Sequence, residues 1–107
     1  MLVSDDRTDL LVENNHLIAR APANIRGLLE VRGMGIVALP AAAKARVALA
    51  VALERPKSRL PAPEFYTPPP GLPVRVPLLR LAPFEASTPA RIVLAVAAFE
   101  QGLFREC

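Results

Sequence analysis

A stretch rich in proline limits what the middle of this chain can fold into. Eight of the 12 prolines fall within residues 55–77. Proline fixes φ and has no backbone N–H, so it interrupts helices and removes hydrogen bonds from the interior of sheets. The run from Pro68 to Gly71 is therefore predicted to be a stiff, extended loop. Residues 72–81 carry apolar side chains between prolines, which predicts an edge strand there.

Ahead of this stretch, short apolar runs alternate with turn residues. Residues 2–3 are typical of the end of a buried strand, although strands usually have about five or six residues. Residues 10–12 and 16–19 are apolar runs that flank an asparagine pair at positions 14–15. Two apolar runs around such a pair predict a β-hairpin.

The segment from residue 23 to residue 53 is expected to hold one short helix and then two strands. Apolar residues at helical spacing predict the helix over residues 23–30. Residues 35–39 are predicted to form a strand that Pro40 closes. Residues 41–45 are ambiguous, because alanine favours helix but the alternation that follows favours a strand. Residues 47–53 alternate larger apolar residues with alanine, which predicts a strand with one face of small side chains.

The clearest helix signal lies near the C-terminus. Ser87 and Thr88 offer a hydroxyl N-cap, and Pro89 suits the first helical position. The predicted apolar face of this helix consists of Ile92, Val93, Val96, Phe99 and Leu103. Because strands and helices are mixed in a chain of 107 residues, we expect a single α/β domain over residues 1–107.

Charge and cysteine content exclude several classes of partner. The net charge is +3, but the basic residues are scattered and aromatic residues make up only 5% of the chain. A nucleic-acid surface usually needs clustered cations and aromatic platforms, so we expect no nucleic acid as partner. No apolar stretch is long enough to span a membrane. Cys107 is the single cysteine, which rules out an internal disulfide and fits a cytoplasmic protein.

Two polar groups lie beside apolar segments. Asp5 and Asp6 follow an apolar segment, and carboxylates at the carboxyl edge of a sheet are placed where open α/β folds bind ligands. In P-loop phosphotransferases one such aspartate helps to hold Mg²⁺, and another carboxylate accepts the proton of the attacking hydroxyl. The alternative interpretation is a pair of turn residues.

The second group runs from Glu30 to Gly35. A carboxylate beside an arginine and a glycine loop is able to bind metal and phosphate together, because Arg32 offers planar, bidentate hydrogen bonds to phosphate oxygens. The alternative interpretation is a helix C-terminus, with Arg32 at the negative end of the dipole and Gly33 as the cap.

Taken together and in this order, the segments LVSDDR (residues 2–7) and LLEVRGMGIVAL (residues 28–39) resemble the HPr kinase/phosphorylase family. The second segment is similar to the family signature. The resemblance is strong over residues 1–39, fair to residue 60 and looser beyond. It implies part of a P-loop kinase-like (PEP carboxykinase-like) mixed sheet with short helices and a C-terminal helix, as in family members that consist of the catalytic domain alone.

The resemblance also implies an activity. The family transfers phosphate from ATP or pyrophosphate to a serine of the phosphocarrier protein HPr, and it reverses the reaction by phosphorolysis with inorganic phosphate. This reaction regulates the phosphotransferase system and carbon metabolism. The implied cofactors are ATP and Mg²⁺, and the implied partners are HPr, nucleotide and phosphate. The family is hexameric, so the resemblance implies a homo-oligomer.

The resemblance also implies roles for the residues that match the family's motifs. Asp6 matches the base that accepts the serine proton, and Asp5 matches the adjacent acid on the metal and nucleotide side. Glu30 matches a Mg²⁺ ligand, and Arg32 belongs to the signature loop that serves both directions. The remaining matches are the nucleotide-binding glycines Gly33 and Gly35 and a further active-site arginine, Arg59.

The chain departs from the family at two places. It contains no G-x-x-x-x-G-K-[ST] string, whose backbone N–H groups would cradle phosphates. We therefore expect an N-terminally incomplete catalytic domain. Residues 81–88 replace a proline-glycine-arginine turn that the family associates with phosphorolysis, so the sequence leaves open whether that direction is retained. The alternatives to an enzyme are a non-catalytic HPr-binding module or an inactive remnant that cannot hold ATP.

Overall fold

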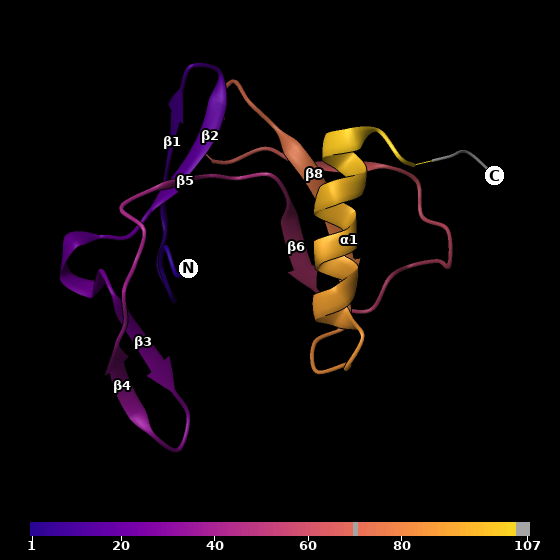
Figure 1. The fold of residues 1–107 in the computed structure, drawn as a ribbon. Helices are drawn as coiled ribbons and strands as arrows, with labels where there is room; N and C mark the ends of the chain where they lie inside the picture. The colour runs from indigo at the N-terminus through magenta and orange to yellow at the C-terminus, as the bar shows by residue number, and fades with distance from the viewer. Residues whose placement is uncertain (70, 105–107) are drawn as a thin grey trace. The chain divides into compact units, whose positions relative to one another are not determined.

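The computed structural model describes residues 1–69 and 71–104 and contains short strands followed by a C-terminal helix (Figure 1). The chain divides into two compact units. The first unit consists of residues 1–47 and 67–74, and the second of residues 48–66 and 75–107. The expectation of one domain over residues 1–107 stays a prediction.

The first unit contains the β-hairpin that the asparagine pair predicted. Strand β1 (Asp9–Glu13) pairs antiparallel with β2 (His16–Arg20). Asn14 and Asn15 have φ of 50° and 64°, and a two-residue hairpin turn of type I′ needs positive φ at both positions. A short third strand, β5 (Ala45–Arg46), lies on the other side of β2. Two adjacent residues of β2, Leu17 and Ile18, are buried and form the core here.

A second hairpin replaces most of the predicted helix over residues 23–30. Only residues Ala23–Ile25 form a short 3₁₀ turn, η1, and strand β3 (Leu28–Val31) then pairs with β4 (Gly35–Ala38). Gly27 has φ of +76°, and its carbonyl accepts a hydrogen bond from Leu39 N–H at 2.7 Å. The helix prediction was wrong because this left-handed residue ends the turn and cross-strand pairing then takes the following residues.

Two other strand predictions for this region hold only in part. Leu2 forms an isolated parallel bridge with Ala41 and is half-buried, so the expected buried strand end is not formed. The strand predicted for residues 47–53 begins later, as β6 (Ala50–Leu53). The amide of Val47 instead donates to the carbonyl of Leu17 at 2.8 Å, and this bond ties residue 47 to β2 in the first unit.

The second unit is built on a mixed three-stranded sheet. Its central strand, β8 (Val76–Leu81), is parallel to β6 and antiparallel to β7 (Glu64–Tyr66). The prediction of an edge strand in residues 72–81 was therefore wrong. Strand β7 lies in the proline-rich stretch of residues 55–77, where no strand was predicted before residue 72. Proline is tolerated in β8 because Pro77 pairs only with β7, whereas pairing with β6 begins at Leu78.

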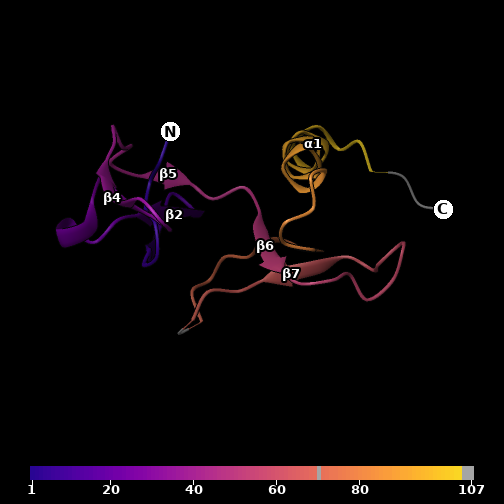
Figure 2. The same ribbon diagram turned by 90° about the horizontal axis from the view of Figure 1, so that it is seen from below.

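Helix α1 (Thr88–Gln101) lies against one face of this sheet (Figure 2). Pro89 stands in its first turn, as the sequence predicted. The expected N-cap bond from Ser87 is not made. Instead, the buried Thr88 hydroxyl donates to the carbonyl of Ala82 at 2.8 Å and ties the helix start to the end of β8.

The helix buries only part of the predicted face, since Ile92 and Val96 are half-buried. Ala95 and Ala98 are its buried apolar residues, while Val93 is 72% exposed. The predicted face was correct only in part because the helix is apolar on nearly all sides, so spacing alone did not select a face. Within the described residues, no helix has the length and hydropathy that a membrane crossing requires. The structure confirms a mixed α/β fold with a C-terminal helix.

Candidate functional site

The paired aspartates lie in a tight turn at the start of the first unit. The Ser4 hydroxyl donates to the carbonyl of Arg7 and closes this turn. Asp5 and Asp6 are its two central residues, and both are exposed. The two carboxylates are therefore open to solvent, where a substrate or metal ion has access to them.

The turn is attached to the segment that resembles the family signature. One carboxylate oxygen of Asp5, Oδ2, accepts a hydrogen bond from the backbone N–H of Glu30 at 3.0 Å. Glu30 lies opposite Ile36 in the β3–β4 ladder. Residues that bond to the partner strand alternate along such a ladder with residues that do not. Gly27 bonds to Leu39, so Glu30, three residues further on, is at a position that does not bond to the partner strand. The N–H of Glu30 therefore points away from β4. Asp5 therefore supplies an acceptor that β4 does not.

Arg32 lies at the tip of the β3–β4 hairpin. The amide of Met34 donates to the carbonyl of Val31 at 2.9 Å, which closes a four-residue turn around Arg32 and Gly33. Gly33 has φ of +80°, the value that the third residue of a type II turn needs. The alternative of a helix C-terminus at this position was wrong. Arg32 and Glu30 are both exposed on the same hairpin, which Gly35 continues into β4.

The remaining predicted site residue lies in the other unit. Arg59 is exposed and belongs to the segment between β6 and β7. The structure thus brings Asp5, Asp6 and Glu30 together in the first unit, with Arg32 at the end of the same hairpin as Glu30.

The carboxylates of Asp5 and Glu30 suit a magnesium ion in their chemistry. Mg²⁺ prefers hard oxygen ligands and is usually held by one or two carboxylates, with waters and substrate phosphates completing its shell. Among the described residues, no three His, Cys, Asp or Glu side chains are gathered into a metal-binding group. The donor set therefore fits an ion that is shared with a phosphate substrate, and it does not fit an ion held by protein ligands alone.

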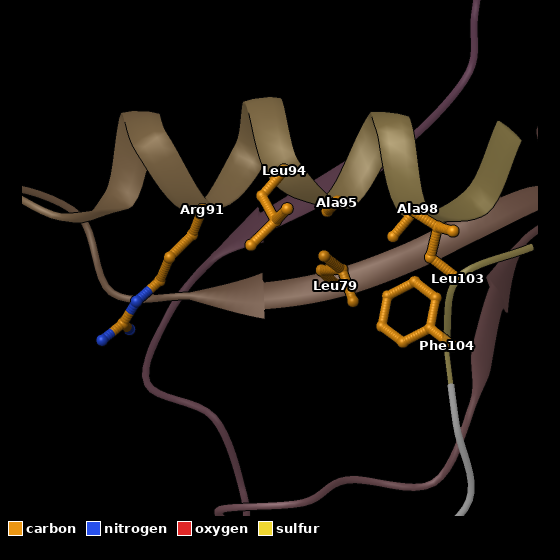
Figure 3. A pocket seen from close by; sticks show the side chains of 7 residues that line it. All are labelled: Leu79, Arg91, Leu94, Ala95, Ala98, Leu103 and Phe104. Carbon is orange, nitrogen blue, oxygen red and sulfur yellow. The ribbon is translucent and has the colours of Figure 1, made fainter. Parts of the chain in front are cut away.

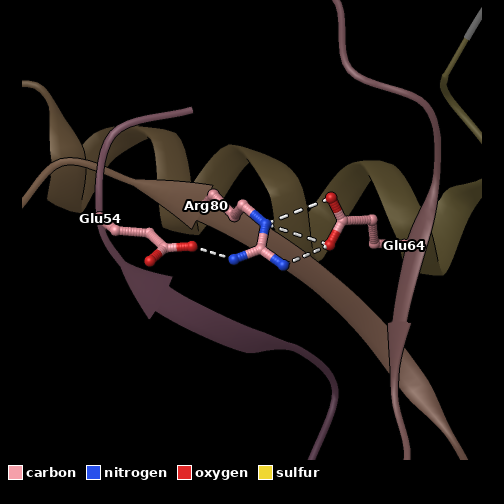
Figure 4. A network of polar contacts seen from close by, with 3 residues as sticks. All are labelled: Glu54, Glu64 and Arg80. Carbon is pink, nitrogen blue, oxygen red and sulfur yellow. Dashed lines mark hydrogen bonds and ion pairs between the residues drawn. The ribbon is translucent and has the colours of Figure 1, made fainter. Parts of the chain in front are cut away.

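A charged network that the sequence interpretation missed crosses the sheet of the second unit (Figure 4). Arg80 on β8 binds Glu64 on β7, with Nε and Nη2 of the guanidinium 2.9–3.2 Å from the carboxylate oxygens. Its Nη1 donates to Glu54, which follows β6. Hydrogen bonding to Arg80 lowers the pKa of Glu64, and hydrogen bonding to Glu64 and then to Glu54 raises the pKa of Arg80. An arginine inside an otherwise apolar strand was the available signal, because such a charge needs partners.

A shallow apolar groove of about 370 Å³ lies between α1 and β8 (Figure 3). Its lining residues are Leu79, Arg91, Leu94, Ala95, Ala98, Leu103 and Phe104. Arg91 is the one charged residue in this lining, and its side chain lies 3.7 Å from the carboxylate of Glu85. The groove contains no carboxylate or nucleophile, so it offers no chemistry to the candidate site.

Comparison with known proteins supports the resemblance at the level of the fold. No family model matches the chain, and no curated protein matches it. Among solved structures, the chain is similar to the Hpr(Ser) kinase/phosphatase from Coxiella burnetii. The two share 25% sequence identity with a TM-score of 0.69, and the match covers 94% of this chain and 68% of that chain. The chain is therefore related in fold to an HPr kinase/phosphatase.

Proposed function

We propose that the chain carries the acidic and signature-loop part of a serine phosphotransfer site of the HPr kinase/phosphorylase type. The observation that carries this proposal is the hydrogen bond from Glu30 N–H to Asp5, 3.0 Å long. It joins the two segments that resemble the family, and a phosphotransfer site needs both. The similarity in fold to an HPr kinase/phosphatase supports the same proposal.

In the proposed reaction, the hydroxyl oxygen of a serine of an HPr-type phosphocarrier attacks the terminal phosphorus of ATP. A new O–P bond forms, the bond from that phosphorus to the bridging oxygen breaks, and ADP leaves with the bonding electrons. Asp6 accepts the serine proton, a role that its exposed carboxylate is able to fill. Arg32 binds phosphate oxygens and offsets the charge that develops on them.

The proposed metal ligands are Asp5 and Glu30. When bound there, Mg²⁺ supplies positive charge that stabilises the phosphate oxygens of the substrate during transfer. The hydrogen bond that Asp5 accepts from Glu30 uses one carboxylate oxygen and leaves the other for a ligand. Gly33 and Gly35 have no side chains, so a nucleotide phosphate is able to approach the backbone at these two positions beside Arg32. Arg59 is proposed as a second phosphate-binding arginine.

One observation favours a second candidate function. The 107-residue sequence contains no P-loop string, so these residues do not provide the backbone cradle that grips ATP phosphates in P-loop enzymes. The second candidate is therefore a module that binds an HPr-type phosphocarrier without transferring phosphate. The P-loop kinase-like sheet, a homo-oligomeric state and a cytoplasmic location are further parts of the proposal that follow from the resemblance and the composition.

Two calorimetric titrations separate the candidates. The first titrates Mg-ATP, and then Mg-pyrophosphate, into the 107-residue chain; the second titrates an HPr-type phosphocarrier. A phosphotransfer site predicts binding of both kinds of ligand, with loss of phosphate binding in Glu30→Gln and retention in the control Glu13→Gln. Phosphocarrier binding without any phosphate binding indicates the non-catalytic module. Absence of both from a folded sample contradicts the proposal.

A further inference from the structure

An exposed, cationic loop joins β6 to β7 in the second unit. We call residues 54–63 the β6–β7 loop, and all of them are exposed. Glu64, the first residue of β7, follows the loop directly. Three basic residues alternate along it, Arg55, Lys57 and Arg59. Within residues 1–69 and 71–104, none of the three forms an ion pair with a carboxylate. The loop therefore presents three positive charges to solvent.

A single guanidinium holds both ends of this loop. Arg80, on the central strand β8, donates from Nη1 to Glu54 at the start of the loop. From its other edge it donates to Glu64 directly after the loop, at 2.9 Å from Nη2 and 3.1 Å from Nε to Oε2. Figure 4 shows the guanidinium between the two carboxylates. The fixed fork of arginine suits such a double contact, which a single ammonium group reproduces poorly.

The same contacts decide which charges remain available on the loop. The two acidic residues that border the cations are Glu54 and Glu64, and both are directed to Arg80. Lys57 also lowers the pKa of Glu64, although less than Arg80 does, so the Lys57 ammonium acts on that carboxylate through space. Without Arg80, Lys57 remains as a loop cation that acts on the carboxylate of Glu64.

We propose that Arg80 is a positioning residue for an anion-binding loop: it holds both ends of the β6–β7 loop and engages the carboxylates of Glu54 and Glu64. The loop cations, which form no ion pair within the described residues, are then left to bind a multivalent phosphate anion. The inference deepens the proposed function and rests on it through Arg59, the second proposed phosphate-binding arginine. It assigns to Arg55 and Lys57 a part in the same binding. Prolines 56, 61 and 63 lower the entropy cost of ordering the loop.

Limited proteolysis with trypsin tests the attachment of the loop without any reference to activity. Trypsin has sites after Lys57 and Arg59, whereas Pro56 protects the bond after Arg55. In Arg80→Met we expect cleavage at the two sites to be faster by about tenfold, because cleavage follows the population of the open loop. The matched control is Arg91→Met, which removes an arginine that pairs with Glu85 in the same unit.

Two further variants keep the test decisive if Arg80→Met does not fold. Glu54→Gln and Glu64→Gln each weaken one end of the loop and keep the size of the side chain. We expect each to raise cleavage after Lys57 and Arg59 by a smaller factor than Arg80→Met. Cleavage rates that stay at the level of Arg91→Met in all three variants contradict the attachment.

A titration with inorganic pyrophosphate tests the second part. We expect Arg80→Met to weaken pyrophosphate binding by about tenfold, the effect of a change near 1.4 kcal/mol. Adding Glu54→Gln and Glu64→Gln to Arg80→Met should restore the affinity but not the protection from trypsin, because no free carboxylates then compete for the loop cations. A merely structural role of Arg80 predicts no such rescue. If the wild-type chain binds no pyrophosphate, both the proposed function and anion binding by the loop are contradicted. If trypsin cleavage is unchanged in the variants, only the attachment of the loop by Arg80 is contradicted.

Discussion

Asp5 and Glu30 are 25 residues apart in the sequence, yet a carboxylate oxygen of Asp5 accepts the backbone N–H of Glu30 at 3.0 Å. The contact attaches the turn that contains the paired aspartates to the outer edge of β3. Because the acceptor is charged and the donor is an edge amide, the bond both satisfies the strand and fixes the place of Asp5 beside Glu30. The proposed phosphotransfer site depends on this relationship.

Removal of the Asp5 carboxylate should loosen the edge of β3. For Asp5→Ala we expect hydrogen exchange at the Glu30 amide to be faster by about fivefold, the effect of about 1 kcal/mol lost from an exposed hydrogen bond. Amide exchange followed by NMR measures this directly. The control is Asp6→Ala, which removes the neighbouring carboxylate and should leave the Glu30 amide unchanged. Equal effects of the two substitutions would show that the contact does not hold β3.

Gly33 should resist replacement for a conformational reason only. Its φ is +80°, and apart from its two chain neighbours no described residue has a heavy atom within 4 Å of the place that a Cβ would occupy. For Gly33→Ala we expect a loss of about 1–2 kcal/mol in the free energy of unfolding, since the left-handed region is unfavourable for residues with a Cβ. Gly33→Asn should lose less because asparagine tolerates this region. Urea denaturation measures both, and a harmless alanine would contradict the turn at Arg32.

Acid should weaken the sheet of the second unit through Glu64. Arg80 lowers the pKa of Glu64 below its ordinary value of 4.5. A group with a lowered pKa contributes stability above its unfolded pKa, and this contribution is lost as the pH falls through the folded pKa. Arg80 has a raised pKa and stays charged throughout the acidic range. We therefore expect the melting temperature to fall more below about pH 4.5 in the wild-type chain than in Glu64→Gln.

The comparison of those two melting curves also identifies the group responsible. Glu85→Gln removes a carboxylate that is 3.7 Å from Arg91 and serves as the control. Its curve should follow that of the wild-type chain. If Glu64→Gln and the wild type lose stability in parallel below pH 4.5, the Arg80–Glu64 pair does not contribute to the stability of the sheet.

The buried hydroxyl of Thr88 should matter for the attachment of α1. It donates to the carbonyl of Ala82 at 2.8 Å, and Thr88 is only 7% exposed. Thr88→Val keeps the shape but leaves that carbonyl without its partner, so we expect a loss of about 1–3 kcal/mol in the free energy of unfolding. Thr88→Ser keeps the hydroxyl and should lose clearly less. Equal losses for the two variants, measured by urea denaturation, would assign the effect to the missing methyl group and contradict the hydrogen bond.

Local sequence signals predicted the elements whose structure depends on local chemistry. The Asn14–Asn15 pair adopts the positive φ values of a tight turn, so the first hairpin follows from two residues. Pro89 in the first turn marked the start of α1. Each of these signals acts within a few residues of the turn or helix start that it determines. Both features are therefore predictable from the sequence without knowledge of tertiary contacts.

Tertiary pairing decided the elements that the sequence did not predict. Ile25, Leu28 and Leu29 have helical spacing, but Gly27 breaks the turn and β4 pairs with the following residues. Proline-rich flanks suggested an edge position for β8, whereas β6 and β7 pair with different parts of it and place it in the centre. No local pattern specifies such a partner strand.

In the candidate site, too, the sequence predicted some residues and missed those that only tertiary structure brings together. The order of the two motifs predicted Asp5 and Glu30 as members of one site, and the structure places them in hydrogen-bond contact. The Arg80 network was missed because its three members come from three separate segments around β6, β7 and β8. Only the sheet register brings Glu64 and Arg80 to adjacent strands.

The most direct test of the central claim is an assay for phosphoserine on an HPr-type phosphocarrier, read by mass spectrometry. The 107-residue chain is incubated with Mg-ATP or Mg-pyrophosphate, and Asp6→Asn is compared with Asp9→Asn as the control carboxylate. We expect phosphoserine with the wild type and the control, and a rate lower by about 10²–10⁴-fold in Asp6→Asn because a general base is lost. Phosphocarrier binding should persist in Asp6→Asn. Equal rates in Asp6→Asn and the wild type, or no phosphoserine from a folded wild-type chain that binds the phosphocarrier, would contradict this claim.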